Sequence, residues 1–452
     1  MILEGRCVSG SALSSCYGER IMNYEEAREF ISKVSARGIE PGLAAITNLL
    51  AELGNPQDQL KFIHVAGTNG KGSVLAYVSS VLQESGYRVG RYISPTLFSY
   101  RERIQINGAY IGREAFARLV TRVAGAMDRM ERLGLGAPTV FEAETAVSFL
   151  YFLEQGCDIV LLEVGMGGRL DATNVIRTPV LTVLASISMD HMAFLGNTLG
   201  EIAYQKAGIF KPGVPAVSAH QQPEAEAVIR AAAQETGCTC EFVDPGQLSG
   251  VTYGLEEQQF TYGAFCEVTI RLAGVHQIEN AALALLCVSK LRSLGYAIPD
   301  RAVYDGLRMT QWRGRFTVVH RDPVVVLDGA HNPDAAQRLR DAVETYFADR
   351  RKYFIFGVFS DKEYDKIIRI TAGLAEHIIT VQTPDNPRAL PAEELAEAVR
   401  SVNLSVEAAA SVGDAVEKGF ALAGKEDVIL VFGSLSFLGE ALRAVEAHGE
   451  GD

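Results

Sequence analysis

A glycine-rich loop that carries one lysine is the stretch of this sequence best suited to chemistry. Residues 67–73 have the sequence GTNGKGS, follow the apolar run 62–66 and precede an amphipathic helical pattern over residues 74–82. A strand, a glycine-rich turn and a helix N-terminus together hold polyphosphate, because backbone N–H groups and the helix dipole face the anion. Lys71 adds a positive charge, and Ser73 can reach a phosphate-bound Mg²⁺ ion. The sequence therefore predicts a phosphate-binding loop.

This loop departs in two ways from the usual pattern, which is GxxxxGK followed by Ser or Thr. Val65 stands where the first glycine would be, and Gly72 separates Lys71 from Ser73. Because the flanking strand and helix are both present, phosphate binding is still favoured over a generic loop.

Three further polar side chains follow apolar runs that are typical of buried parallel strands. They are Ser94 after residues 88–93, Glu163 after residues 159–162 and His191 after residues 180–187. In open α/β sheets ligands bind at the carboxyl ends of the strands, which is the edge that also carries the phosphate loop. Taken singly, Ser94, Glu163 and His191 are better explained as a cap, a surface charge and a core histidine. Together they predict Mg²⁺ ligands, of which Glu is the natural hard ligand and His the less usual one.

Lys206 occupies an unexpected position in a predicted helix over residues 199–210. Leu199, Ile202, Lys206 and Ile209 recur at steps of three and four, so the lysine lies on the inward stripe. Burial should lower the pKa of its amine and favour the neutral form. The pattern alone favours a snorkelling side chain. The alternative is a neutral amine near a metal that takes up CO₂ and becomes an anionic carbamate ligand.

Composition limits the class of protein. A chain of 452 residues with 48% apolar residues suits two domains. Acidic residues exceed basic ones by 55 to 42, which argues against a nucleic-acid partner, and no apolar run is long enough to span a membrane. Seven scattered cysteines indicate a reducing, cytoplasmic setting. Residues 1–21 lack the apolar core of a signal peptide and are predicted to be a disordered leader, with Met22 as an alternative start.

Strand and helix patterns alternate along the rest of the chain, which predicts an α/β fold. Helices are expected within residues 24–53 and over 113–133, 141–155 and 276–294, and hairpins over 101–108 and 253–262. After a hinge at residues 309–315 the alternation restarts, with strands at 324–327, 353–358, 378–381 and 428–432. We therefore predict a larger N-terminal phosphate-loop ATPase-like domain with a mainly parallel sheet (22–311) and a smaller C-terminal Rossmann-like α/β domain (312–452).

The sequence resembles the folylpolyglutamate synthase and dihydrofolate synthase family, within the muramyl-ligase superfamily. Motifs in family order across about residues 22–440 carry the resemblance: the GTNGKGS loop, Ser94-Pro95, and residues 102–104, 163–174, 190–191, 206–211, 328–333 and 387–391. The hinge sequence differs from the more common Trp-Pro-Gly-Arg form because Arg313 replaces the proline.

The resemblance implies an ATP-dependent ligase that adds L-glutamate to the γ-carboxylate of a reduced folate through an acyl phosphate. It leaves open a second activity on dihydropteroate, and it implies a monomer that uses Mg²⁺ and makes residues 312–452 the glutamate-ligase domain. The ATP-binding positions would be Asn69, Gly70, Lys71, Gly72, Ser73, Asn280, Arg315 and Asp328. The metal positions would be Ser94, Glu163, His191 and carbamylated Lys206, and the catalytic positions Lys71, Lys206 and His331. The folate positions would be Gly42, Leu43, Leu170, Asp171 and Ala172.

Two other functions are weighed against this one. A muramyl-peptide ligase would share the mechanism, but such enzymes usually carry an extra N-terminal domain, and only 66 residues precede Gly67. A phosphate-loop switch that hydrolyses nucleotide slowly would need neither the environment of Lys206 nor an amino-acid acceptor site. Dependence of ATP breakdown on both folate and glutamate separates the switch from a ligase.

Overall fold

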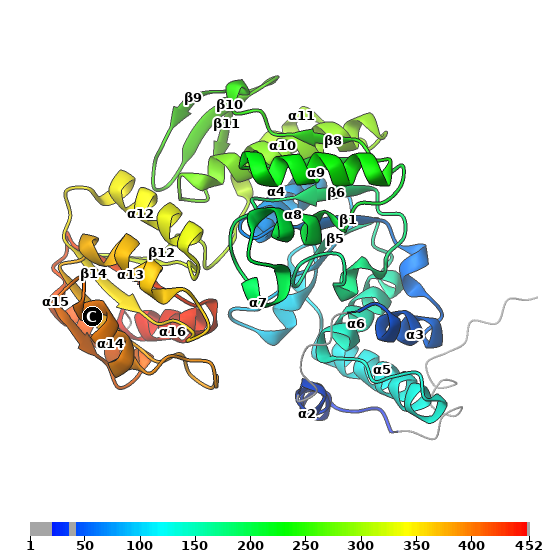
Figure 1. Ribbon diagram of the computed structural model, residues 1–452, viewed down its shortest axis with the longest axis horizontal. Helices are drawn as coiled ribbons and strands as arrows, with labels where there is room; N and C mark the ends of the chain where they lie inside the picture. Colours follow the sequence, from blue (N-terminus) through cyan, green and yellow to red (C-terminus); the bar gives the residue numbers. More distant parts are fainter. Residues whose placement is uncertain (1–19, 36–41, 450–452) are drawn as a thin grey trace, which may run out of the picture.

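The computed structural model describes residues 20–35 and 42–449 (Figure 1). Most of the predicted leader, residues 1–19, lies outside this range. The N-terminal part is built on an eight-stranded sheet in the order β4-β3-β2-β5-β1-β6-β7-β8, in which β3 pairs antiparallel with both β2 and β4 and all other neighbouring strands are parallel. The strands are β1 Phe62–Ala66, β2 Val89–Tyr92, β3 Ile104–Ile106, β4 Ala109–Tyr110, β5 Ile159–Glu163, β6 Leu181–Leu184, β7 Ala216–Ser218 and β8 Cys240–Phe242.

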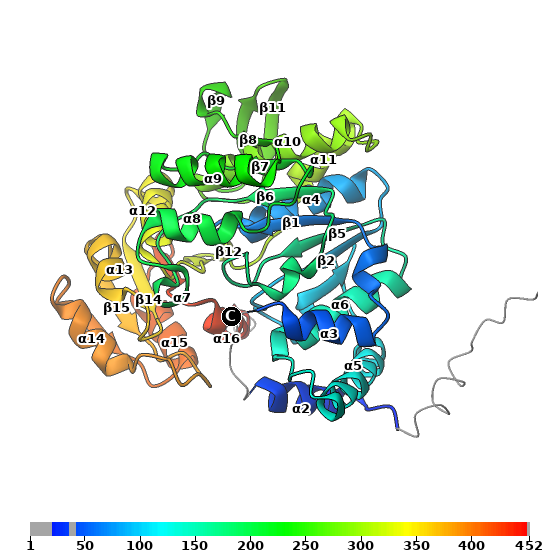
Figure 2. The ribbon, with the colours of Figure 1, turned by 45° about the vertical axis from the view of Figure 1, so that its right-hand side comes forward.

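Helices cover both faces of this sheet, which explains why its central strands are continuous apolar runs. In β5, Ile159 and Leu161 enter one core and Val160 and Leu162 the opposite one. Figure 2 shows the sheet between the two sets of helices. One set is α4 Lys71–Glu84, α10 His276–Ser293 and α11 Asp300–Met309; the other is α2 Tyr24–Ser35, α3 Ala44–Glu52, α5 Arg113–Leu133 and α6 Val140–Glu154. Helices α8 Leu199–Ala207 and α9 Pro223–Thr236 pack together near β6 and β7.

The predicted hairpin at residues 253–262 is wrong in its first strand. The structure has a three-stranded antiparallel sheet of β9 Leu248–Thr252, β10 Gln258–Tyr262 and β11 Phe265–Ile270, and residues 253–257 connect the first two strands. Strand β9 buries almost none of its side chains, so its sequence has no apolar alternation to detect. The predicted hairpin with a turn at Asn107 and Gly108 is confirmed by the antiparallel pair of β3 and β4, but its first strand begins only at Ile104, because Tyr100–Arg103 forms a 3₁₀ turn.

The C-terminal part has its own sheet of six strands in the order β12-β13-β17-β14-β15-β16, parallel except for β12. The predicted restart of strand and helix alternation is confirmed, and the predicted boundary at residue 311 falls between α11 and β12. The strands are β12 Thr317–Arg321, β13 Val324–Leu327, β14 Lys352–Phe356, β15 His377–Thr380, β16 Val406–Ala408 and β17 Val428–Phe432. The helices are α12 Pro333–Phe347, α13 Tyr364–Thr371, α14 Ala392–Arg400, α15 Val412–Leu422 and α16 Leu438–Gly449.

Candidate active site

The glycine-rich loop joins β1 to α4 at the carboxyl edge of the first sheet, as predicted. Gly70 has φ +86°, which favours glycine, and a Cβ there would lie 2.4 Å from Oδ1 of Asn280. A Cβ on Gly72 would lie 2.6 Å from the ring of Trp312. Close contacts with α10 and with the hinge therefore explain why Gly70 and Gly72 are glycines.

The start of α4 offers backbone donors to an anion. The helix begins at Lys71 with Gly70 as its N-cap, and no side chain caps it. Its first N–H groups have no partner within the helix, so they are available to a phosphate. Ser73 is buried, and its Oγ accepts a hydrogen bond from Nε2 of Gln277 at 3.3 Å.

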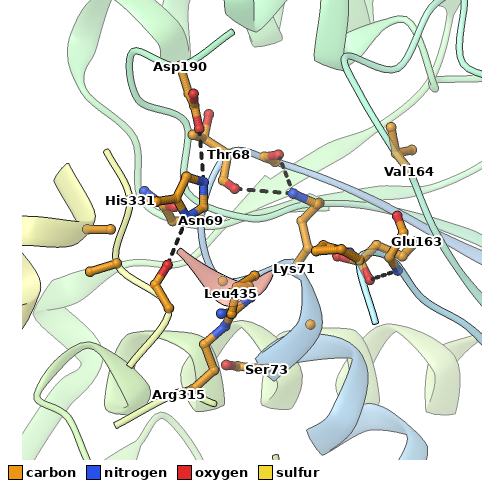
Figure 3. Close-up of a pocket in the computed structure, with 18 of the residues that line it drawn as sticks. Thr68, Asn69, Lys71, Ser73, Glu163, Val164, Asp190, Arg315, His331 and Leu435 are labelled. Carbon is orange, nitrogen blue, oxygen red and sulfur yellow. Dashed lines mark hydrogen bonds and ion pairs between the residues drawn. The ribbon is translucent and has the colours of Figure 1, made fainter. Parts of the chain in front are cut away.

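Lys71 and Glu163 place opposite charges beside the loop (Figure 3). The ammonium of Lys71 donates to the carbonyl oxygens of Gly67 at 3.1 Å and Thr68 at 3.2 Å. Burial lowers the pKa of Lys71, and the carboxylate of Glu163 opposes that shift. Burial likewise raises the pKa of Glu163, opposed by Lys71. Each charge thus offsets part of the cost of burying the other.

Glu163 also has room for a cation. The residue is 5% exposed, and its carboxylate accepts a hydrogen bond from the backbone N–H of Ser94 at 3.1 Å, which leaves most of the carboxylate lone pairs for other ligands. Burial lowers the pKa of His191 to about 4, so its ring is neutral and can act as a metal ligand. Within the described ranges, no three His, Cys, Asp or Glu side chains gather closely enough to hold a metal alone. A cation here would therefore need hydroxyl or phosphate oxygens as well.

Lys206 is buried as its place in the sequence predicts. Only 4% of the residue is exposed, and Nζ donates to the carbonyl oxygen of Gly67 at 2.8 Å. Burial, reinforced by the nearby charge of Lys71, lowers the pKa of Lys206 to about 7. A substantial fraction of this amine is thus neutral at physiological pH. The snorkelling alternative is wrong for this residue, because the ammonium does not reach solvent.

The second domain contributes three of the expected residues to the same place. Arg315 follows Gly314, whose φ of +76° turns the hinge into the pocket, and the carboxylate of Asp328 accepts the backbone N–H groups of Phe316 and Ala330, each at 2.8 Å. Nδ1 of His331 bonds to the carbonyl oxygen of Gly329 at 2.8 Å, so Nε2 is the ring atom left for other partners. Although Arg313 replaces the more common proline of the hinge, Arg315 still lines the pocket, as expected for an ATP-binding residue.

Asp190 is a member of the site that sequence reasoning missed. Its carboxylate pairs with Nζ of Lys362 at 2.7 Å and receives Nδ2 of Asn332 at 3.0 Å, and Nε2 of His331 lies 3.5 Å away. These three partners come from the second domain. The charges of His331, Lys362 and His191 and the hydrogen bond from His331 hold the pKa of Asp190 well below its usual range against the effect of burial. The sequence signals for Asp190 were its position directly before His191 and its place in the motif at residues 190–191, neither of which indicated its partners.

A side chain of the phosphate loop also forms hydrogen bonds with the second domain. The side-chain amide of Asn69 donates to Oδ2 of Asp334 at 2.7 Å and to Oδ1 of Asn332 at 3.3 Å. Arg338 on α12 donates to Ser186 Oγ at 3.2 Å. The two domains therefore meet directly over the loop.

Two neighbouring cavities that share part of their lining result. The smaller, about 150 Å³, is lined by the loop, Lys206 and all the expected ATP, metal and catalytic residues. The larger, about 630 Å³, is lined by Gly42, Leu170, Asp171 and Ala172 together with residues of both domains. Leu43, the remaining expected folate residue, packs against the core instead of lining this cavity. Residues common to both linings are Ser94, Pro95, Gly165, Met166, Gly167, His191, His331 and Leu435.

Comparisons with known proteins place these features in a family. Residues 65–288 match the model of the Mur ligase middle domain, and residues 314–435 match that of the Mur ligase glutamate ligase domain. The chain is 37% identical over 427 residues to the dihydrofolate synthase/folylpolyglutamate synthase of Bacillus subtilis, covering 92% of this chain and 98% of that protein.

Solved structures agree over the same length. The folylpolyglutamate synthase of Mycobacterium tuberculosis complexed with ADP has a TM-score of 0.86 at 28% identity, covering 93% of this chain and 98% of that one. E. coli FolC in complex with DHPP and ADP has a TM-score of 0.83 at 28% identity, covering 95% and 99%.

Proposed function

Because the chain belongs to the folylpolyglutamate synthase/dihydrofolate synthase family of the Mur ligase superfamily, we propose that it joins L-glutamate to the γ-carboxylate of a reduced folate with hydrolysis of ATP to ADP and phosphate. We propose further that it accepts dihydropteroate, as the name of the Bacillus subtilis relative says of that protein. It would act as a monomer in the cytoplasm, where the described cysteines stay free. No helix within residues 20–35 and 42–449 is long and apolar enough to cross a membrane.

The observation that carries this proposal is the junction of the two cavities. The phosphate loop closes one of them, and the other is large enough for a folate-sized molecule. Ser94, His191 and His331 line both cavities. On this proposal, a carboxylate in the larger cavity would meet the terminal phosphate there. A nucleotide switch would have no use for the second cavity.

The residues at the junction suit acyl transfer. An acceptor carboxylate oxygen attacks the γ-phosphorus, the bond to the leaving ADP oxygen breaks, and an acyl phosphate forms. Lys71 reduces the repulsion between the two anions. The amine of glutamate then attacks the acyl carbon, the carbon–oxygen bond to phosphate breaks, and the amine loses a proton. We assign that proton to Nε2 of His331, because Asp190 lies 3.5 Å away and would stabilise the imidazolium.

A divalent cation fits the residues on the other side of the loop. Glu163, His191 and the hydroxyl of Ser94 would hold Mg²⁺ together with phosphate oxygens, since Glu163 is a buried carboxylate with lone pairs to spare and His191 is neutral. A cation held by these residues would neutralise phosphate charge. We propose in addition that Lys206 is carbamylated, which would give the Mg²⁺ ion an anionic oxygen ligand.

The experiment that tests the function is a coupled assay of ADP release from purified protein. ATP, Mg²⁺ and glutamate are supplied with tetrahydrofolate, dihydropteroate or a UDP-muramyl acceptor in separate reactions. We expect release that depends on both glutamate and a pterin acceptor. Release with the muramyl acceptor alone would support the muramyl-peptide ligase instead, and release that needs neither acceptor nor glutamate would support the nucleotide switch.

A further inference from the structure

A buried histidine outside the proposed reaction has an unusual environment. His64 lies in the middle of β1, is fully buried, and its Nε2 is 2.8 Å from Oγ1 of Thr173. Its other nitrogen, Nδ1, is buried without a hydrogen-bond partner. An unpaired polar atom in a core costs free energy, so a purely structural role would be better filled by an apolar side chain.

The hydrogen bonds around Thr173 determine which nitrogen of His64 carries the proton. The hydroxyl of Thr173 has one hydrogen, which it donates to Oδ1 of Asp171. The hydroxyl oxygen must therefore accept its bond from His64, so Nε2 is protonated and Nδ1 is the bare nitrogen. Burial and the nearby charge of Lys211 lower the pKa of His64 to about 3, which keeps the ring neutral.

This chain of donors ends on a carboxylate that faces the larger cavity. Oδ1 of Asp171 accepts both the hydroxyl and the backbone N–H of Thr173, and Oδ2 accepts the backbone N–H of Met166 at 2.9 Å. Burial raises the pKa of Asp171, and these hydrogen bonds, together with one from the backbone N–H of Gly165, oppose that shift and favour the carboxylate. Asp171 lines the cavity proposed for the pterin. A pterin carries an amino group beside a ring N–H, and a carboxylate held in one orientation is a suitable acceptor for such donors.

We propose that His64 is a positioning residue for substrate recognition: through Thr173 it fixes the orientation of the Asp171 carboxylate that receives the pterin. The proposal rests on the folate-ligase function proposed above. The link also ties the short turn Ala172–Val175, capped by Asp171, to the central strand of the sheet. Loss of the imidazole donor would leave the Thr173 hydroxyl free to rotate and the carboxylate less well aligned.

Two substitutions at residue 64 separate this role from packing. His64→Gln can place an amide N–H where Nε2 now lies, whereas His64→Leu fills the space without a donor. We expect the Leu variant to raise KM for dihydropteroate and tetrahydrofolate about tenfold, which is the effect of weakening one hydrogen bond between the pterin and the charged carboxylate of Asp171. The Gln variant should stay near wild type. KM for ATP should hardly change in either. Thr173→Val should reproduce the Leu effect, and the double variant should be no worse than either single one.

The outcomes distinguish this proposal from the function on which it rests. A wild-type enzyme inactive with every pterin acceptor would reject the function. An active wild type with unchanged pterin KM in a folded His64→Leu variant would reject only the role of His64, as would an equal rise in KM for ATP. Nitrogen-15 NMR of the ring is an independent readout: we expect protonated Nε2 and bare Nδ1, and the opposite tautomer would overturn the proposed donor chain.

Discussion

The contact between Gly72 and Trp312 gives the sharpest mutational prediction. Gly72→Ala would place a Cβ 2.6 Å from Cζ2 and 2.9 Å from Cε2 and Nε1 of the indole. Carbon atoms in good contact are about 3.5–4.0 Å apart. The indole or the first turn of α4 must therefore move by about 1 Å.

Two opposing effects determine the change in the free energy of unfolding. Alanine in a helix is favoured over glycine by up to about 1 kcal/mol, whereas overpacking costs about 1–3 kcal/mol. We expect a net destabilisation of about 0–2 kcal/mol. The effect on catalysis should be larger, because Gly72 lies between Lys71 and Ser73, and a misplacement of about 1 Å can cost about a hundredfold in rate.

Urea unfolding and steady-state kinetics with dihydropteroate test this prediction against a matched control. Gly413 is likewise the second residue of its helix, α15, and a Cβ there meets only Ser411 Oγ at 3.7 Å. Gly413→Ala should be neutral or slightly stabilising and leave kcat unchanged. In a Trp312→Phe background, Gly72→Ala should cost less than in the wild type. Equal kcat values for the Gly72→Ala and Gly413→Ala enzymes would refute the reasoning.

Three further predictions concern charged groups of the site. Lys71→Ala should lower kcat about a thousandfold or more, because the repulsion between γ-phosphate and carboxylate is no longer offset; near-normal turnover would be incompatible with the proposed chemistry. Asp190→Ala removes the partner of Lys362, 2.7 Å away, so small-angle scattering should show a less compact protein, and an unchanged profile would argue against a domain contact. The amine of Lys206 loses its proton as pH rises through its pKa of about 7, so uptake of ¹³C-bicarbonate as carbamate should increase from about pH 6 to about pH 8; absence of label across that range would exclude the carbamate.

Local sequence patterns predicted those parts of the site that depend on single elements. The apolar stripe of one helix was enough to predict the burial of Lys206, and strand ends were enough to bring Ser94, Glu163 and His191 to one edge. The depressed pKa of Lys206 follows from the same stripe. These predictions succeeded because helical and strand periodicities determine which way a side chain faces.

The residues that pattern reasoning missed depend on how the two domains meet. Asp190 and Lys362 are 172 positions apart in the sequence, and no periodicity links them. Arg315 and Asp328 were expected only through the resemblance to a family, since their own segments show no more than a strand end and a turn. His64 was taken as part of an apolar strand, because only the structure shows its link to Thr173. Strand β9 was missed because its side chains are mostly exposed.

The position of the hinge indole also has an optical consequence. Trp312 is the single tryptophan of the chain and packs against the residue between Lys71 and Ser73. Its fluorescence therefore comes from one place, the seam where nucleotide and both domains meet. Titration of the unlabelled protein with ATP analogues should change that emission, which would allow occupancy of the loop to be followed in real time without a chemical dye.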